Sequence, residues 1–264
     1  IDRGLMGGLQ DTQNKKIQKA AVEAQRYGVE MDSVLSVMSD LSKIMGRNVL
    51  ISDEDISRLA IFKEAMPTAD VELMVKYFDQ MGFSVQQALD FGNDMAGVAR
   101  GMGLNIGKFM ETVTRNMEMM NTYNFADGVQ GFARMAAQAQ KLGLDMGKVS
   151  QIAEDVMDPE GAISLAANLQ VIGGAVGDLA DPFKMMYMAT NDLEGLQNAI
   201  VQAGTDLAVF NEETGEISFP PTAQRQLREL AKTLNMSKEE LSSMIKLQTK
   251  FASMQNQFSM ALEA

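Results

Sequence analysis

The sequence lacks three residue types on which much protein chemistry depends, since its 264 residues include no His, no Cys and no Trp. Without Cys, the chain has no disulfide, thiolate zinc site, iron–sulfur cluster or cysteine nucleophile. Without His, it has no Ser-His-Asp triad, histidine base or imidazole metal ligand. Carboxylates, Lys, Tyr and hydroxyl groups remain for catalysis. The composition therefore favours a protein that is not an enzyme and needs no cofactor.

Positive charge is also scarce, with 23 Lys and Arg against 35 Asp and Glu and a net charge of −12. Proteins that bind nucleic acid normally carry a basic surface, so we expect no specific nucleic-acid binding. The negative charge is unevenly distributed, because the net charge of residues 145–217 is −11 whereas that of residues 222–250 is +3. The two stretches could attract each other, or the acidic stretch could be a solvated face. The solvated face is favoured, because isolated surface attractions contribute little.

Neither residues 1–20 nor the longest uncharged run predicts a targeting or membrane-spanning segment. The chain begins with Ile1, and residues 1–20 contain Lys15, Lys16 and Lys19 without an apolar core, so we expect an excised piece that has no signal peptide. The longest uncharged run, 161–177, has 17 residues, fewer than the roughly 20 that a spanning helix needs. We interpret this run as a buried helix followed by a Gly-rich exit.

Apolar residues recur at helical spacing along most of the chain, for example over residues 34–45, 106–120 and 241–254. The sequence therefore predicts an all-α fold, a multi-helix array of about ten to twelve short helices. Longer helices are expected near residues 105–120 and 237–260. Only residues 216–219, between the turn-like Thr214-Gly215 and Pro220-Pro221, favour extended structure.

Polar residues at regular offsets mark the expected helix N-termini. Asp158-Pro159 and Asp181-Pro182 are typical of an N-cap residue followed by Pro in the first helical position. In a capping box, the first side chain accepts a hydrogen bond from an otherwise unpaired backbone N–H. Four segments fit this pattern: Ser52-x-x-Asp55, Ser84-x-x-Gln87, Asn191-x-x-Glu194 and Ser237-x-x-Glu240.

One turn pattern recurs, in which a Gly or Asn is followed by an apolar residue and then by a polar residue. It predicts a helix C-terminus with positive φ, a buried apolar residue, and the N-cap of the next helix. Two copies are nearly identical over residues 102–108 and 142–148. The five copies are Gly28-Val29-Glu30, Gly82-Phe83-Ser84, Gly103-Leu104-Asn105, Gly143-Leu144-Asp145 and Asn235-Met236-Ser237. A similar turn occurs in DNA-reading helix-turn-helix proteins, but the helix after Gly143 is acidic, which disfavours DNA.

Three segments were considered for chemistry. Residues 52–55 could hold a hard cation, but carboxylates at a helix start are favoured by the helix dipole, so capping is preferred. Residues 212–216 could supply paired carboxylates, but no partner group at a matching distance along the chain supports this, and a solvated turn is preferred. Residues 173–177 are Gly-rich but lack the Lys-Ser/Thr of a phosphate-binding loop. No catalytic, cofactor-binding or metal-binding residue is assigned.

Methionine is unusually frequent, at 23 residues, and clusters near residues 117–120 and 185–188. Met fills irregular gaps in helical cores and also forms adaptable contact surfaces. The core explanation is preferred, and a surface for self-association remains the alternative.

Residues 124–248 resemble an internal helical region of the tail-tape-measure proteins of tailed bacteriophages. The order of several short segments over this stretch carries the resemblance, rather than any single motif. These segments are residues 128–133, 136–144, 152–155, 161–170, 191–196, 210–215 and 228–241. Residues 1–123 are compatible with the family but carry no signature. We therefore divide the chain into an N-terminal helical region, 1–123, and a tape-measure-like region, 124–264.

The resemblance implies a structural virion protein that sets tail length and occupies the tail tube or tip until DNA is ejected. It implies a location in the phage tail, and in the host cytoplasm during assembly. The implied partners are copies of itself and tail tube, tail tip or baseplate proteins, with membrane contact confined to infection. It supplies no catalytic residue. Family members are usually much longer and contain long coiled coils. The alternative is an all-α scaffold or chaperone-like interaction module with a Met-rich contact surface.

Overall fold

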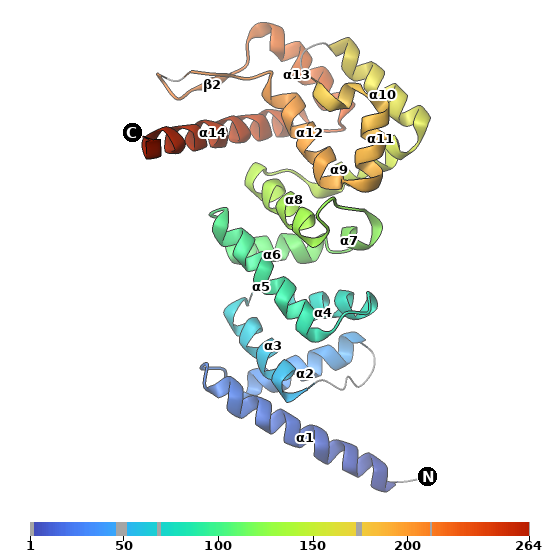
Figure 1. The fold of residues 1–264 in the computed structure, drawn as a ribbon, viewed down its shortest axis with the longest axis vertical. Coiled ribbons are helices and arrows are strands. Elements are labelled where there is room, and N and C mark those ends of the chain that lie inside the picture. The colour runs from blue at the N-terminus through green and yellow to red at the C-terminus, as the bar shows by residue number, and fades with distance from the viewer. Residues whose placement is uncertain (1–2, 46–51, 68–69, 173–175, 212, 264) are drawn as a thin grey trace. The chain divides into compact units, whose positions relative to one another are not determined.

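The computed structural model describes residues 3–45, 52–67, 70–172, 176–211 and 213–263. These residues form fourteen α-helices, one 3₁₀ helix and two short strands (Figure 1). The predicted all-α array is confirmed, with slightly more helices than expected. The chain divides into two compact units, Ile1–Asn121 and Thr122–Ala264, called here the first unit and the second unit. This division lies close to the boundary placed after residue 123.

The described residues of the first unit form six main helices, each packed against at least one other. Helix α1 packs on α2 and α3, α2 packs on α4, and α3 packs on α5. Leu59, Met74 and Met95 are among the fully buried core side chains. The helices are α1 (Arg3–Gln25), α2 (Met31–Met45), α3 (Asp53–Ala65), α4 (Val71–Gln80), α5 (Val85–Gly101) and α6 (Ile106–Arg115). A single helical turn, α7 (Met119–Thr122), lies where the two units divide.

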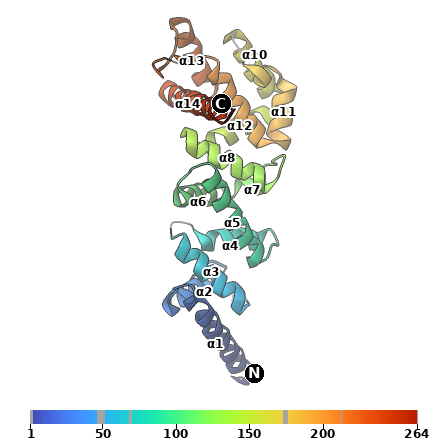
Figure 2. The same cartoon turned by 60° about the vertical axis from the view of Figure 1, so that its left-hand side comes forward.

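The second unit contains the remaining helices and a small hairpin. Helix α11 packs against α9, α10 and α12 (Figure 1), whereas α14 packs against α8, α12 and α13 (Figure 2). Its helices are α8 (Val129–Leu142), α9 (Met146–Met157), α10 (Pro159–Ile172), the 3₁₀ helix η1 (Gly177–Ala180), α11 (Pro182–Asn191), α12 (Leu193–Thr205), α13 (Pro221–Thr233) and α14 (Lys238–Glu263). Strands β1 (Val209–Phe210) and β2 (Ile217–Ser218) pair antiparallel, with Val209 opposite Ser218 and Phe210 opposite Ile217.

All five predicted turns have the expected backbone conformation. The Gly or Asn has positive φ in each case, from 51° at Asn235 to 82° at Gly28. The next residue then donates a backbone hydrogen bond to the carbonyl five positions earlier, as Leu144 N–H does to Ala139 O at 2.8 Å and Met236 N–H does to Ala231 O at 2.8 Å. This bond pattern is the Schellman motif, which satisfies carbonyls left open at a helix C-terminus.

The apolar residue of these turns is not always buried, contrary to the prediction. Val29 and Leu144 are buried, whereas Leu104 and Met236 are half-buried and Phe83 is exposed. The Phe83 ring instead lies against the Phe78 ring, with centroids 5.6 Å apart. The hydrogen bonds alone therefore define the turn, because burial depends on which helices lie beside it.

Most of the predicted caps are present. Ser84 and Gln87 form a complete capping box, Ser237 and Glu240 bond reciprocally, and Ser52 accepts from the backbone N–H of Asp55. Asp158 accepts from Gly161 N–H before the Pro159 helix, and Asp181 caps α11 ahead of Pro182. The capping box at Asn191 was wrong by one residue. Asn191 ends α11, and its neighbour Asp192 caps α12 by accepting from Gly195 N–H at 3.0 Å.

One of the two expected long helices is confirmed and the other is wrong. Helix α14 covers the predicted span near 237–260. The span 105–120 is broken, because α6 ends at Arg115 and α7 begins at Met119. Asn116 caps this break with its side-chain amide, which donates to Thr112 O at 2.8 Å. Met117 and Met119 remain buried beyond the break, so the apolar period continues although the helix does not.

Residues 161–172 of the uncharged run lie in α10, which is buried on one face only rather than all round as expected. In α10, Ala162, Ala166 and Leu169 face the core, but Ile163 is 59% exposed and Val171 is 88% exposed. The expected Gly-rich exit falls partly on residues 173–175, which lie outside the described residues. None of the helices in the described ranges is both long and apolar enough to cross a bilayer.

Candidate functional site

The acidic segments considered for chemistry serve local structure instead. Ser52 Oγ accepts from Asp55 N–H at 3.1 Å and donates to Asp55 Oδ2 at 2.7 Å, so residues 52–55 cap α3. Across the part of the chain that the structure describes, acidic residues form no group able to hold a metal ion. The hydrogen bond from Asp55 N–H to Ser52 Oγ confirms the prediction that this segment caps a helix.

Asn211 and residues 213–216 lie in the turn of the β-hairpin. Asn211 Oδ1 accepts from the backbone N–H groups of Glu213 and Thr214 at 2.9 and 3.1 Å, and Gly215 N–H donates to Asn211 O. The Glu213 and Glu216 side chains are exposed. This is the solvated turn that was preferred, while Glu212 lies outside the described residues. Residues 173–175 of the Gly-rich segment also lie outside the described residues, while Val176 precedes η1 and Gly177 begins it.

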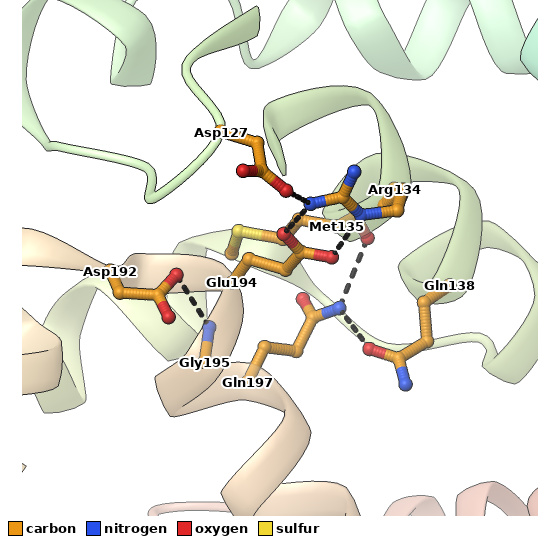
Figure 3. Close-up of polar contacts among 8 residues, drawn as sticks. All are labelled: Asp127, Arg134, Met135, Gln138, Asp192, Glu194, Gly195 and Gln197. Carbon is orange, nitrogen blue, oxygen red and sulfur yellow. Dashed lines mark hydrogen bonds and ion pairs between the residues drawn. The ribbon is translucent and has the colours of Figure 1, made fainter. Parts of the chain in front are cut away.

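The most elaborate polar arrangement joins α8 to α12 in the second unit (Figure 3). Arg134 donates from Nε and Nη2 to both carboxylate oxygens of Glu194, each at 2.7 Å, and from Nη2 to Asp127 at 2.6 Å. The hydrogen bonds that Arg134 donates to Glu194, and then the one to Asp127, raise the pKa of the Arg134 guanidinium above its ordinary value. We call Asp127, Arg134, Glu194, Gln138 and Gln197 the polar cluster.

Gln197 is the buried member of the polar cluster. Its Nε2 donates to Met135 O at 3.0 Å and to Gln138 Oε1 at 2.7 Å (Figure 3). Among the described residues, its Oε1 has no hydrogen-bond partner. A buried amide that bonds to a backbone carbonyl fixes the register of two packed helices, because moving either helix would leave more polar groups unpaired. This arrangement supports helix positioning rather than chemistry.

The segment before α8 is tied to the junction of α11 and α12. Leu193 N–H donates to Asn124 O at 3.0 Å, and Asn124 Nδ2 donates to Thr190 O at 2.9 Å. A Cβ at Gly131 would lie 3.1 Å from Glu194 Oε2 and 3.1 Å from Phe125 Cβ, so the absence of a side chain there lets α8 approach closely. The sequence does not predict the polar cluster, because no motif or spacing relates Arg134 to Glu194.

Tyr123 makes a second polar link in the same unit. Its hydroxyl donates to Glu154 Oε1 on α9 at 2.9 Å, and the residue is nearly buried. Burial, followed by the hydrogen bond to the Glu154 carboxylate, raises the pKa of Tyr123 above its ordinary value. The phenol therefore stays neutral and acts as a donor that fixes α9.

Among the described residues, one ion pair joins the acidic stretch 145–217 to the basic stretch 222–250. In this pair the acidic stretch supplies the cation and the basic stretch supplies the anion. Lys148 of the acidic stretch contacts both oxygens of Glu240, from the basic stretch, at 2.9 and 2.8 Å. This contact, together with the backbone N–H and side chain of Ser237, lowers the pKa of Glu240 to about 2. The acidic side chains Asp155, Asp158, Glu160 and Asp206 are exposed, as expected for a solvated face.

The second unit also has an open groove of about 1100 Å³ between α10 and α13. Its lining includes Glu154, Asp155 and Asp158, and Arg225, Glu229 and Lys232 line it from α13. Opposite charges within one groove favour a charged partner over an apolar small molecule. A smaller groove of about 350 Å³ lies beside α11, where the aromatic side chains Phe183 and Tyr187 are exposed.

Methionine contributes mainly to the core. Met117 and Met119 are buried in the cluster near residues 117–120, and Met185 is buried in the cluster near residues 185–188. The fully buried large side chains also include Met74, Met95, Met110, Met135 and Met146. The burial of these residues favours the core explanation over a Met-rich surface.

Comparisons with known proteins do not extend these observations. The chain matches no protein-family model, and neither a curated protein nor a solved structure is significantly similar to it.

Proposed function

We propose that this chain is a structural segment of a phage tail, a tape-measure-like protein that acts through helix–helix contacts. In this role it sets tail length and occupies the tail tube or tip until DNA is ejected. It binds copies of itself and proteins of the tail tube, tip or baseplate, and it is not an enzyme. Its location is the virion, after assembly in the host cytoplasm.

One observation carries the proposal beyond the resemblance. The resembling residues, 124–248, lie within one compact unit, Thr122–Ala264. The polar side chains that this unit brings together connect its helices: Arg134 to Glu194, Gln197 to Met135, Tyr123 to Glu154, and Lys148 to Glu240. Polar groups used in this way support a scaffold of fixed shape, as a structural role requires.

The location of the chain in purified phage particles tests the proposal. Tails from the phage that encodes the chain are separated from heads, digested with trypsin and analysed by mass spectrometry. Peptides 109–115 and 142–148, which lie between tryptic sites, report the first and second units. We expect both peptides in the tail fraction, at a fixed ratio to the tube protein, and their loss after DNA ejection. Their absence from tails would contradict the proposal.

A scaffold or chaperone-like module is the second candidate. Its Met-rich contact surface lacks support, because many of the described methionines, such as Met74, Met95 and Met135, are fully buried. Such a module would be found free in the host cytoplasm rather than in particles. The same fractionation therefore separates the two candidates.

A further inference from the structure

Residues 123–128, called here the strap, form a non-helical segment between α7 and α8. Asn124 fastens one end of the strap through its hydrogen bonds to the junction of α11 and α12. Asp127 fastens the other end, because its carboxylate accepts from Arg134 Nη2 at 2.6 Å (Figure 3). The path of the strap is therefore fixed at two points, which leaves little room for a longer backbone between them.

The strap contains a pair of residues with its own chemistry, Asp127-Gly128. It is the single Asp-Gly pair of the chain, and the chain has no Asn-Gly pair. In an Asp-Gly pair the backbone nitrogen of the Gly can attack the Asp side-chain carbon, because the Gly has no side chain to obstruct the approach. Every other Asp of the chain is followed by a residue with a side chain. The sequence therefore favours this reaction at one position only.

The folded strap holds this peptide bond in a state that resists the attack. Gly128 N–H donates to Phe125 O at 2.9 Å, and Asp127 O accepts from Gln130 N–H at 3.2 Å, so both polar groups of the peptide bond are occupied. The Asp127 carboxylate is held by Arg134. Gly128 has a φ of 55°, which a residue with a side chain adopts only under strain. The attack therefore requires the strap to open first, as a local unfolding event.

We propose that Asp127 is a site of isoaspartate formation and that opening of the strap controls the reaction. The Gly128 nitrogen forms a bond to Cγ of the protonated Asp127 side chain. The carboxyl OH leaves as water together with the amide hydrogen of Gly128, and a five-membered succinimide ring results. Water then opens the ring at the former main-chain carbonyl, which becomes a carboxylate, and the chain now continues through Cγ. The mass is unchanged, and water is the only co-reactant.

Isoaspartate at position 127 does not fit the strap. The backbone is longer by one methylene group, and the new carboxylate is attached directly to Cα rather than carried on a side chain. The strap is fixed at Asn124 and continues directly into α8, so the extra length is accommodated only by giving up the bond to Arg134. Opening of the strap therefore becomes permanent once the reaction has occurred.

Three variants of the full chain separate local opening from other causes. Arg134→Met removes the group that holds Asp127. Asp127→Glu is the chemical control, because it keeps the carboxylate but requires a six-membered ring, which forms far more slowly. Ile245→Val is the stability control, because Ile245 is buried in the same unit and lies beside Gly204, at the far end of α12 from Glu194. Urea denaturation measures the stability of each variant, so that reaction rates are compared at known stability.

The product is measured after incubation at physiological pH and temperature. The tryptic peptide 116–134 contains Asp127 as its single Asp, and so does the longer peptide 116–141 that the Arg134→Met variant yields. Isoaspartate gives a peptide of unchanged mass and altered retention, which an isoaspartate-specific methyltransferase labels. Deamidation of the Asn residues in the same peptide changes its mass and is thereby distinguished.

The folded wild-type chain should form isoaspartate at least about tenfold more slowly than the same chain in urea, because the reaction needs an open strap. Arg134→Met should raise the rate in the folded chain roughly five- to thirtyfold, since the strap loses its charged hydrogen bond. Ile245→Val should raise it much less, and Asp127→Glu should form no product.

Three results would overturn the inference. Equal rates in the folded and the urea-unfolded wild type would show that the strap does not protect Asp127. Equal increases in Arg134→Met and Ile245→Val, at equal stability, would show that global unfolding controls the reaction. Absence of isoaspartate from the urea-unfolded chain would show that the site does not react. The inference concerns the purified chain and does not depend on the phage-tail role.

Discussion

Arg134 on α8 donates two hydrogen bonds to the Glu194 carboxylate on α12, from Nε and Nη2, each at 2.7 Å. The two residues are far apart in the sequence, and the geometry is the bidentate one that suits a guanidinium and a carboxylate. The pair therefore connects helices that local sequence signals cannot connect. It is the clearest example of how this unit uses charged groups to hold helices together.

Replacing Arg134 by Met should destabilise the second unit. The change leaves the largely buried Glu194 carboxylate without its main partner, so the free energy of unfolding should fall by about 1–2 kcal/mol. Urea denaturation followed by circular dichroism measures this effect. Lys184→Met is the matched control, since it breaks the exposed pair with Asp178 and should leave stability unchanged within error. Equal effects of the two variants would contradict the role given to Arg134.

Two glycines of α5 should respond to Ala in opposite directions. A Cβ at Gly92 would collide with the buried Phe62 ring of α3, so Gly92→Ala should destabilise the first unit by about 1–3 kcal/mol. A Cβ at Gly97 would meet no atom within 4 Å, so Gly97→Ala should stabilise it by about 0.5–1 kcal/mol. Thermal unfolding of both variants checks the pair. A stabilising Gly92→Ala would show that α3 and α5 do not pack this closely.

Acid should weaken the contact between α9 and α14. Lys148 and Ser237 hold the pKa of Glu240 at about 2, below the roughly 4.3 of a free Glu. As the pH falls, Glu240 is therefore protonated in the unfolded chain before it is protonated in the folded one. The contribution of Glu240 is present above about pH 4.5 and is lost as the pH falls towards 2. It should be at most about 1 kcal/mol, because the side chain is half-exposed.

The variant Glu240→Gln tests this dependence. Its stability deficit relative to wild type should be present at pH 6 and should shrink steadily between about pH 4.5 and 2. Glu239→Gln is the control, because it removes the adjacent charge, which makes no ion pair among the described residues. A Glu240→Gln deficit that stays constant with pH would contradict the assignment.

The acidic surface should keep the chain from binding DNA. The exposed carboxylates of the stretch 145–217 repel phosphates, and DNA binding normally depends on cations that displace counterions. Fluorescence anisotropy with labelled duplex DNA at physiological salt should show no binding up to about 100 μM, the weak end of non-specific affinities. Tighter binding would contradict the idea that the acidic chain avoids passing DNA.

Local features of this fold were predictable because their causes lie within a few residues. The Schellman turn at Gly143 needs positive φ at one residue and one backbone bond, and the cap at Ser84 needs two side chains three positions apart. The all-α class follows from the same local signals, repeated along the chain.

Helix continuity and burial were less predictable, because they depend on distant elements. The helical spacing of apolar residues over 105–120 indicates which residues are buried, but it does not show where the helix ends. Met117 is buried although the helix has already ended at Asn116. The run 161–177 has the composition of a buried helix, but the elements packed against α10 cover one face and leave Ile163 and Val171 exposed on the other. The two-residue strand β1 is too short for any periodic pattern to predict.

The polar cluster and the exposure of the α11 aromatic side chains could not be predicted either, because both depend on how distant helices pack. Arg134 and Glu194 carry no shared motif, and only the packing of α8 on α12 brings them together. Phe183 resembles a core residue until α11 is placed with Met185 and Ala189 facing inward.

Tail length in deletion and duplication variants tests the central claim most directly. The first unit, Ile1–Asn121, is compact by itself, so it can be removed or duplicated in frame while the second unit stays intact. Electron microscopy of the resulting particles should show shorter tails after deletion and longer tails after duplication. A change of at most about 180 Å is expected, the length of this unit as extended helix. Tails of wild-type length in both variants would contradict a tape-measure role.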